Sequence, residues 1–253
     1  MARNIKLVLA YDGTDYHGWQ MQPDRPTIQS TLQRALWRVL GGPAQPPEAS
    51  GRTDAGVHAL AQVVTFRTDK PIPAANLVPA LNDVLPADIR VLSAEEFPPD
   101  FHPRDCAKAK TYRYRLLRTA ICPPFVARFV SHYPYPLDEA AMLAAASLVE
   151  GEHDFTSFAA VDPEKGLEDD DRSKVRTIFS SRWHRDRDEL VYEVRGSGFL
   201  HHMVRNLVGT FLLLGKGTIN VEDLKRILDL KDRSAAGPTV GPEGLYLVNV
   251  EYQ

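Results

Sequence analysis

Hydrophobic and polar residues alternate with two different periods along the chain, and these periods predict strands and helices. The period of two residues that is typical of strands occurs at residues 4–11, 62–68, 111–118, 189–195 and 244–252. The spacing typical of a helix face occurs at residues 27–40, 138–150, 200–214 and 221–230. Strands and helices follow one another in a similar order in both halves, which favours a duplicated α+β unit.

Residues that begin and end helices support two of these predictions. Thr27 is placed as the N-cap of the helix at 27–40, and Gly41-Gly42 follow its last residue. Asp138 is placed as the N-cap of the helix at 138–150, and Gly151 follows it. Asp12-Gly13-Thr14, directly after the first strand, predicts a turn.

The composition is typical of a folded globular protein, since 43% of the 253 residues are hydrophobic and 25% are charged. The longest uncharged apolar run, residues 207–215, is too short to span a membrane. The apolar stretch near the N-terminus is interrupted by Lys6 and is too short for a signal-peptide core. Cys106 and Cys122 have neither metal-ligand spacing nor the spacing of a disulfide framework. We therefore expect a cytoplasmic protein.

The net charge of −3 argues against a general nucleic-acid binder, because lysine and arginine contacts to phosphate supply most non-specific affinity. Positive charge is instead concentrated in residues 104–118, which contain six basic residues and one acidic residue. The basic residues are Arg104, Lys108, Lys110, Arg113, Arg115 and Arg118. They are interleaved with Tyr112 and Tyr114, which suits RNA, since phosphates pair with cations and bases stack on aromatic rings. The same pattern also describes a solvated strand face beside buried tyrosines.

One carboxylate, that of Asp54, lies between two glycines in the turn-rich segment Gly-Arg-Thr-Asp-Ala-Gly-Val-His-Ala at residues 51–59. The glycines permit tight backbone geometry and the close approach of a substrate. The residues alone leave two interpretations open. Asp54 is either a reactive carboxylate or the first residue of an Asx-turn that closes a surface loop.

Residues 196–207 place a cation on a predicted helix. If the helix covers residues 200–214, its apolar residues form a buried stripe, and His201 and Arg205 share another face. Arg205 is then either a cation held on a rigid element or a surface arginine beside a core helix. The adjacent His201 and His202 would point to different helix faces, so we expect no metal site. Residues 209–217 lack the spacing of a phosphate-binding loop.

Several longer motifs occur along nearly the whole chain. They are Tyr11-Asp-Gly-Thr14, Gly18-Trp-Gln20, Gly51-Arg-Thr-Asp-Ala-Gly-Val-His58, Lys110-Thr-Tyr-Arg-Tyr114, Asp154-Phe-Thr-Ser-Phe158, Phe199-Leu-His-His-Met-Val-Arg-Asn206 and Glu243-Gly-Leu-Tyr246. Taken together, these motifs resemble those of the tRNA pseudouridine synthase A family. The Asp54 loop and the segment that contains Arg205 are highly specific in combination.

The resemblance implies an isomerase that converts uridine to pseudouridine at positions 38, 39 and 40 in the anticodon stem-loop of tRNA, with no metal and no other cofactor. It implies an α+β fold of two ferredoxin-like, RRM-like halves that share a central, mainly antiparallel sheet covered by helices. The active-site cleft would lie between the halves, which we place at residues 1–104 and 105–253. A homodimer whose subunits hold one tRNA together is implied as well.

The resemblance also assigns roles to individual residues. Asp54 matches the catalytic aspartate, and Arg205 matches the arginine that pairs with that carboxylate. Tyr112 matches the active-site tyrosine, and Arg52 would guide the RNA backbone or the flipped base. Further candidate tRNA contacts are Lys110, Arg113, Arg115, His201 and His202. The acidic loop at residues 163–171 departs from the family pattern, which leaves tRNA contacts there open.

Two other functions would use some of the same residues. A non-catalytic RNA-binding module would use the basic and aromatic strand, but a carboxylate in its cationic groove would repel phosphate. A nucleoside or glycosyl hydrolase would use Asp54 at a glycosidic carbon, but such enzymes usually need a second carboxylate, which no motif supplies. For the isomerase, the sequence does not choose between attack by Asp54 on the sugar or the ring and removal of the C2′ hydrogen.

Overall fold

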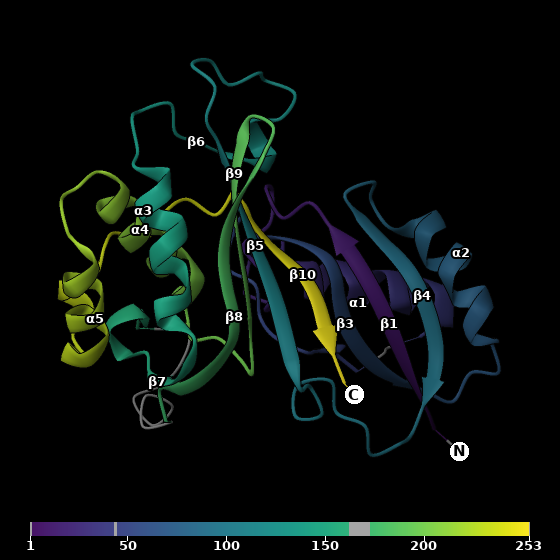
Figure 1. The fold of residues 1–253 in the computed structure, drawn as a ribbon. Coiled ribbons are helices and arrows are strands. Elements are labelled where there is room, and N and C mark those ends of the chain that lie inside the picture. Colours follow the sequence, from purple (N-terminus) through teal and green to yellow (C-terminus); the bar gives the residue numbers. More distant parts are fainter. Residues whose placement is uncertain (1, 43–44, 162–172, 253) are drawn as a thin grey trace. The chain divides into compact units, whose positions relative to one another are not determined.

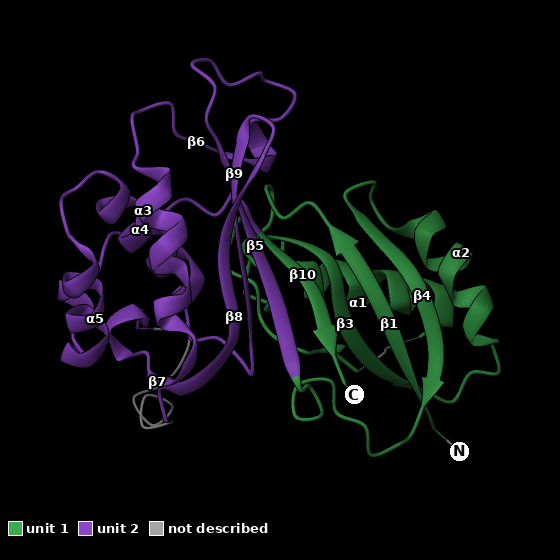
Figure 2. Cartoon of the chain, viewed as in Figure 1, with its two compact units in different colours: residues 1–108, 246–253 green, residues 109–245 purple. Residues whose placement is uncertain are grey.

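The computed structural model describes residues 2–42, 45–161 and 173–252. The protein belongs to the α+β class, and most of its strand pairs are antiparallel, as the sequence predicts (Figure 1). The chain forms two compact units, which Figure 2 shows in different colours. Unit 1 is Met1–Lys108 with Tyr246–Gln253, and unit 2 is Ala109–Leu245. The chain therefore returns to unit 1 at its end, which the division proposed at residue 104 did not include.

The strands of unit 1 pair in the order β4-β1-β3-β10. They are β1 (Arg3–Tyr11), β2 (Glu48–Ala49), β3 (His58–Thr68), β4 (Ile89–Phe97) and β10 (Leu245–Glu251). β1 pairs antiparallel with β3 and β4, and β10 pairs in parallel with β3. β2 forms a short antiparallel pair with β3. β3, which directly follows the Asp54 loop, is thus hydrogen-bonded on both sides.

β1 and the first helix form where the residue pattern predicts them. Ile5, Leu7 and Leu9 of β1 are completely buried and alternate with less buried residues. α1 (Ile28–Leu40) and α2 (Ala74–Val84) cover one side of the unit 1 strands (Figure 1). Thr27 accepts a hydrogen bond from a backbone N–H of α1 as its N-cap, and Gly41 adopts a φ of 70° after its last residue.

The sequence analysis did not predict α2 and β4, because neither has a clear local pattern. α2 contains Pro79 and lacks a side-chain N-cap. In β4 only Ile89 and Val91 are buried, so hydrophobic residues do not alternate along its length. Both elements therefore depend on packing within unit 1 more than on their own residue pattern.

The strands of unit 2 pair antiparallel in the order β5-β9-β8-β7. They are β5 (Ala109–Leu117), β7 (Gly151–Asp154), β8 (Val175–Asp186) and β9 (Glu189–Gly196), with β6 (Ser131–His132) parallel to β5. The helices are α3 (Glu139–Ala145), α4 (Met203–Gly215) and α5 (Val221–Leu230), with short 3-10 turns at Ala127–Phe129, Ala146–Val149, Thr156–Phe158 and Arg233–Ala235. In the described part of the chain, no helix is long and apolar enough to cross a membrane.

An aromatic cluster fixes α4 on the strands of unit 2. Phe211 of α4 lies against Trp183 of β8 and Tyr192 of β9, with ring centroids 6.1 and 5.4 Å apart. All three side chains are buried. Because aromatic rings of this size bury large apolar areas, α4 is a rigid support for the residues in its first turn.

The structure corrects two predicted helices of unit 2 and contains strands that the sequence analysis did not predict. The helix predicted at 138–150 begins after its N-cap Asp138, but its α-helical part ends at Ala145 and a 3-10 turn follows. The helix predicted at 200–214 begins only at Met203, because His202 has a left-handed φ of 58°. β7 and β8 were not predicted. In β8 an irregularity in register near residue 179 interrupts the alternation on which a prediction would rest.

Residues 237–244, which we call the strap, lie in close contact with α4. The backbone N–H of Gly237 donates a hydrogen bond to Oγ1 of Thr210 at 2.9 Å. Beside it, a Cβ atom added to Gly209 would lie only 1.8 Å from the carbonyl oxygen of Pro238. The absence of a side chain at Gly209 therefore allows the strap to reach the helix.

Replacing Gly209 by alanine is expected to lower the free energy of unfolding. A helix interior normally gains about 0.5–1 kcal/mol from this substitution. Here the added methyl group would overlap the backbone of Pro238, and overpacking of this kind costs about 1–3 kcal/mol or more. Urea titration of the wild type and the variant measures the difference.

Gly215→Ala, at the end of the same helix, is the matched control. Its added Cβ atom would approach the sulfur of Met142 to 2.5 Å, but this flexible side chain can move aside. Gly209→Ala should therefore be the less stable variant. Equal stability of the two variants would show that the strap does not lie as close to α4 as the structure has it.

Candidate functional site

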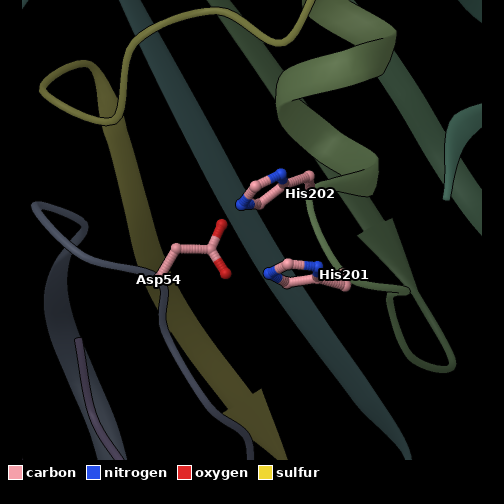
Figure 3. Close-up of side chains that lie close together, drawn as sticks. All are labelled: Asp54, His201 and His202. Carbon is pink, nitrogen blue, oxygen red and sulfur yellow. The ribbon is translucent and has the colours of Figure 1, made fainter. Parts of the chain in front are cut away.

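Asp54 lies in the loop between β2 and β3 (Figure 3), and the residue is partly exposed. Its backbone carbonyl accepts a hydrogen bond from the N–H of Val57 at 3.1 Å, which closes a turn directly before β3. Gly56 supplies the left-handed conformation of this turn, with a φ of 78°. Backbone atoms therefore close the turn that presents the carboxylate.

The chain that follows β1 holds the Asp54 loop through its backbone. The N–H of Trp19 donates to the carbonyl of Thr53 at 3.0 Å, and the N–H of Gly56 donates to the carbonyl of Tyr16 at 3.2 Å. Gly18 has a φ of 81°, and a Cβ atom added there would lie 2.6 Å from the carbonyl oxygen of Thr53. The two backbones thus lie closer than any side chain would allow.

Buried polar side chains support the loop from β1 and β3. The hydroxyl groups of Tyr11 and Thr53 form a hydrogen bond of 2.9 Å. Nε2 of Gln62 donates to the carbonyl of Gly51 at 2.8 Å, and its Oε1 accepts from the hydroxyl of Ser50 at 2.7 Å. Burial raises the pKa of Tyr11 to about 12, so its hydroxyl stays protonated at neutral pH.

His58, the first residue of β3, connects the loop to the turn after β1. Its Nδ1 lies 3.1 Å from the N–H of Gly13 and 3.2 Å from Oδ1 of Asp12. Nδ1 can accept from Gly13 when unprotonated or donate to Asp12 when protonated, so these contacts are alternatives. The ring also stacks on Tyr246 of β10 at 4.8 Å. The sequence analysis gave His58 no role and placed Asp12 only in a turn, although each of them lies in a family motif.

Tyr112 lies in β5 on the face opposite to Arg113 and Arg115, as the alternation of the sequence predicts. Its ring makes an edge contact with Phe199, with centroids 4.9 Å apart and planes at 76°. The side chain is only 8% exposed. Because Phe199 precedes α4, Tyr112 is packed against the segment that leads to Arg205.

Arg205 lies in the first turn of α4, where the strap orients its guanidinium. Its Nε donates to the carbonyl of Val240 at 2.7 Å. The next carbonyl of the strap, that of Gly241, accepts from the hydroxyl of Tyr114 at 2.9 Å. Burial raises the pKa of Tyr114, so this hydroxyl remains a donor. The strap thus joins the arginine of α4 to a tyrosine of β5.

Arg113 and Arg115 form ion pairs with acidic residues of β9. Arg113 lies 2.8 Å from Glu193, and Arg115 lies 2.6 Å from Glu189. Burial would raise the pKa of Glu193, but its contacts with Arg182 and Arg113 outweigh burial and lower it. The positive charge that the sequence places in residues 104–118 is thus partly offset within unit 2. Contacts of Arg113 and Arg115 with tRNA remain a prediction.

His201 and His202 lie in the turn before α4, which corrects two expectations. His201 shares no helical face with Arg205, because the helix begins after it. The two rings do not point apart: their centroids lie 3.9 Å apart with planes at 30° (Figure 3). Neighbouring imidazoles are common metal ligands, so the expectation that no metal binds now rests on the family resemblance alone.

The structure also locates the remaining candidates. Arg52 is exposed and lies in the same loop as Asp54 in unit 1. Lys110 is partly buried at the start of β5 in unit 2, on the strand face that carries Tyr112. The acidic loop at residues 163–171 lies outside the described residues.

The comparisons with known proteins agree with these motifs. A family model described as tRNA pseudouridine synthase matches residues 7–104 and 145–253. The chain belongs to the tRNA pseudouridine synthase family. The matched ranges contain the Asp54 loop and α4, and the predicted family is confirmed. They omit β5 with Tyr112, which full-length relatives cover.

Relatives of this pseudouridine synthase match it over nearly its whole length. A tRNA pseudouridine synthase A of Solibacter usitatus is 51% identical over 250 residues, which are 99% of this chain and 100% of the relative. The one of Lacticaseibacillus casei is 43% identical over 98% of this chain and 99% of the relative. A chain in a crystal structure of a Cbf5-Nop10-Gar1 complex matches 82% of this chain and 53% of its own length. Its TM-score of 0.36 and identity of 11% are too low to support a conclusion about fold or function.

Gly18→Ala is expected to slow the reaction of this synthase by about 10-fold or more, because the new methyl group would displace the backbone that presents Asp54. The substitution also carries the cost of about 1–2 kcal/mol that an alanine pays for a left-handed backbone. Pseudouridine formation in a tRNA transcript measures the rate.

Gly41→Ala separates these two effects. Gly41 has a similar φ of 70°, but nothing lies within 4 Å of its added Cβ atom. This variant should lose stability as Gly18→Ala does and keep a rate within about 2-fold of the wild type. If both variants react equally fast, the contact at Gly18 does not position Asp54.

Proposed function

We propose that this protein isomerises uridine to pseudouridine at positions 38, 39 and 40 in the anticodon stem-loop of tRNA, with Asp54 as the reactive carboxylate. The family match and the close relatives named tRNA pseudouridine synthase A support the reaction and the substrate class. The observation that supports Asp54 is its loop: it lies within the range that the family model matches and is held by the backbone of Tyr16 and Trp19. Such a loop holds the backbone from which the carboxylate projects in a fixed place.

The reaction rearranges one nucleotide and conserves its atoms. The N1–C1′ bond breaks, the uracil turns, and a C5–C1′ bond forms. C5 loses a proton and N1 gains one. Asp54 acts either as a nucleophile at the sugar or the ring, which is later released, or as the base that removes the C2′ hydrogen. Each of these roles needs an ionised carboxylate, and none needs a metal or a redox cofactor.

The target uridine must leave the stacked stem before a side chain can reach it, and this flipping costs a few kcal/mol. In the proposed mechanism Tyr112 packs on the base and Arg52 guides the RNA backbone. Arg205 is proposed to pair with the catalytic carboxylate, as the resemblance to the family implies. Lys110, His201 and His202 are proposed as tRNA contacts.

Asp54→Asn should form pseudouridine at least about 1000-fold more slowly than the wild type, because the amide is neither a nucleophile nor a base. The assay uses an unmodified tRNA transcript with a chelator and without nucleotide, and maps pseudouridine at each position. The wild type should modify positions 38, 39 and 40. Transcripts with cytidine at one of these positions identify which uridines react.

Asp69→Asn, an exposed acid after β3, is the matched control and should react at the wild-type rate. Binding of the transcript to Asp54→Asn should be no weaker than to the wild type, because the change removes a negative charge near phosphates. Turnover by Asp54→Asn at the wild-type rate would exclude Asp54 as the reactive group. Binding without any product from the wild type would support an RNA-binding module instead.

We further propose that the enzyme is a homodimer that acts in the cytoplasm. The family resemblance supports the dimer, and the free Cys106 and Cys122 are consistent with a reducing compartment. Sedimentation equilibrium should give twice the 28.3 kDa of one chain. A mass of one chain at the concentration of the activity assay would contradict the dimer.

A further inference from the structure

Arg233, in the 3-10 turn after α5, binds the strap and α4 with the same guanidinium group. Its Nη1 donates to the carbonyl of Gly237 at 2.9 Å. Its Nη2 donates to Oδ1 of Asn206 at 2.9 Å and reaches Oγ1 of Thr239 at 3.2 Å. Within the described ranges, the hydrogen-bond partners of Arg233 are neutral oxygens. The arginine therefore connects its own turn, the strap and α4 within unit 2.

Asn206, the neighbour of Arg205 in α4, is the centre of this network. Its side chain is completely buried. Oδ1 accepts from the hydroxyl of Thr239 at 2.6 Å as well as from Arg233, and Nδ2 donates to the carbonyl of Phe158 at 2.7 Å. A buried amide with this many partners has one orientation, which it imposes on the groups that bind it.

The network ends one residue before the carbonyl that receives Arg205. Thr239 is fixed through its hydroxyl, which both accepts from Arg233 and donates to Asn206. The following residue, Val240, directs its carbonyl to Nε of Arg205. One hydrogen bond at Nε restricts the plane of a guanidinium and leaves its two Nη groups to make other contacts.

We propose that Arg233 is a positioning residue for Arg205. It fixes the strap against Asn206, so that the Val240 carbonyl holds the guanidinium of Arg205 in the plane needed for its proposed pairing with the catalytic carboxylate. This inference rests on the proposed role of Arg205 in the reaction. It assigns a function in the reaction to a residue that does not itself contact the substrate.

Arginine is suited to this task in a way that lysine is not. The oxygens of Gly237, Asn206 and Thr239 lie around a planar group with several fixed donors. A lysine has its three donors on one nitrogen and cannot reach the same set of oxygens. Arg233→Lys should therefore behave like Arg233→Ala, although it keeps the charge. A role in general attraction of RNA would instead be preserved by lysine.

The test measures single-turnover pseudouridine formation with the full chain in excess over a tRNA transcript. Arg233→Ala should lower the rate constant by about 10- to 100-fold, as expected for a misplaced reacting group, while the fraction of tRNA that reacts and its affinity change little. Thr239→Val removes only the hydroxyl that joins Arg233 to Asn206 and should lower the rate in the same way. A melting curve checks that each variant is folded.

The decisive comparison combines these changes with Arg205→Ala. If Arg233 acts through Arg205, adding Arg233→Ala or Thr239→Val to Arg205→Ala should slow the reaction by less than about 2-fold. Arg226→Ala, which removes an exposed arginine of α5 paired with Asp223, is the matched control and should not change the rate.

Three outcomes would overturn the inference, and they differ in whether the proposed role of Arg205 fails with it. If Arg205→Ala is slow but Arg233→Ala and Thr239→Val react at the wild-type rate, the positioning role is wrong and the role of Arg205 stands. If the Arg233 change slows both backgrounds equally, Arg233 acts independently of Arg205. If Arg205→Ala itself reacts at the wild-type rate, the proposed role of Arg205 fails together with the positioning role.

Discussion

The presentation of Asp54 depends on one close backbone approach, that of Gly18 to Thr53. The carbonyl of Thr53 would lie 2.6 Å from any Cβ atom at position 18, and it accepts the N–H of Trp19 at 3.0 Å. A single contact of this kind fixes little, but here Tyr11 holds the Thr53 side chain while the backbone is held by the chain after β1. Because β3 is hydrogen-bonded on both sides, the loop cannot shift along the sheet. The backbone position of Asp54 is therefore set by residues far from it in sequence.

Local patterns predicted the elements whose residues carry their own signal. β1 and α1 have regular periods, and α1 has both a Thr27 cap and a left-handed Gly41, so their observed bounds agree with the predicted ones. α2, β4 and β8 were missed because a proline, exposed positions or an irregular register hides the period. The start of α4 was misplaced for a related reason. The left-handed backbone of His202 delays the start of the helix to Met203, but the residue sequence shows no break at this position.

In the candidate site, the motifs identify individual residues but not the partners that those residues have in the structure. The family motifs identified Asp54, Tyr112 and Arg205 as residues of interest, but they did not show that Arg113 and Arg115 have acidic partners. Those partners, Glu193 and Glu189, come from the neighbouring strand β9, whose register places Glu193 opposite Arg113 and Glu189 diagonally across from Arg115. Charge clusters in one stretch of sequence therefore overestimate the local field whenever the next strand supplies acids.

Both units position a candidate site residue by the same physical means. In unit 1 a glycine lets one backbone approach the Asp54 loop, and in unit 2 Gly209 lets the strap approach α4 beside Arg205. The groups that then hold these segments are uncharged. The hydroxyl of Tyr11 is hydrogen-bonded to that of Thr53, and the carbonyl of Val240 accepts from Arg205. This choice has an electrostatic reason. A carboxylate in the place of the Val240 carbonyl would also orient the guanidinium, but it would cancel much of the charge that the arginine is proposed to supply. A carbonyl fixes the direction of a cation with little loss of its field, which is why backbone segments make suitable supports for charged residues in a site.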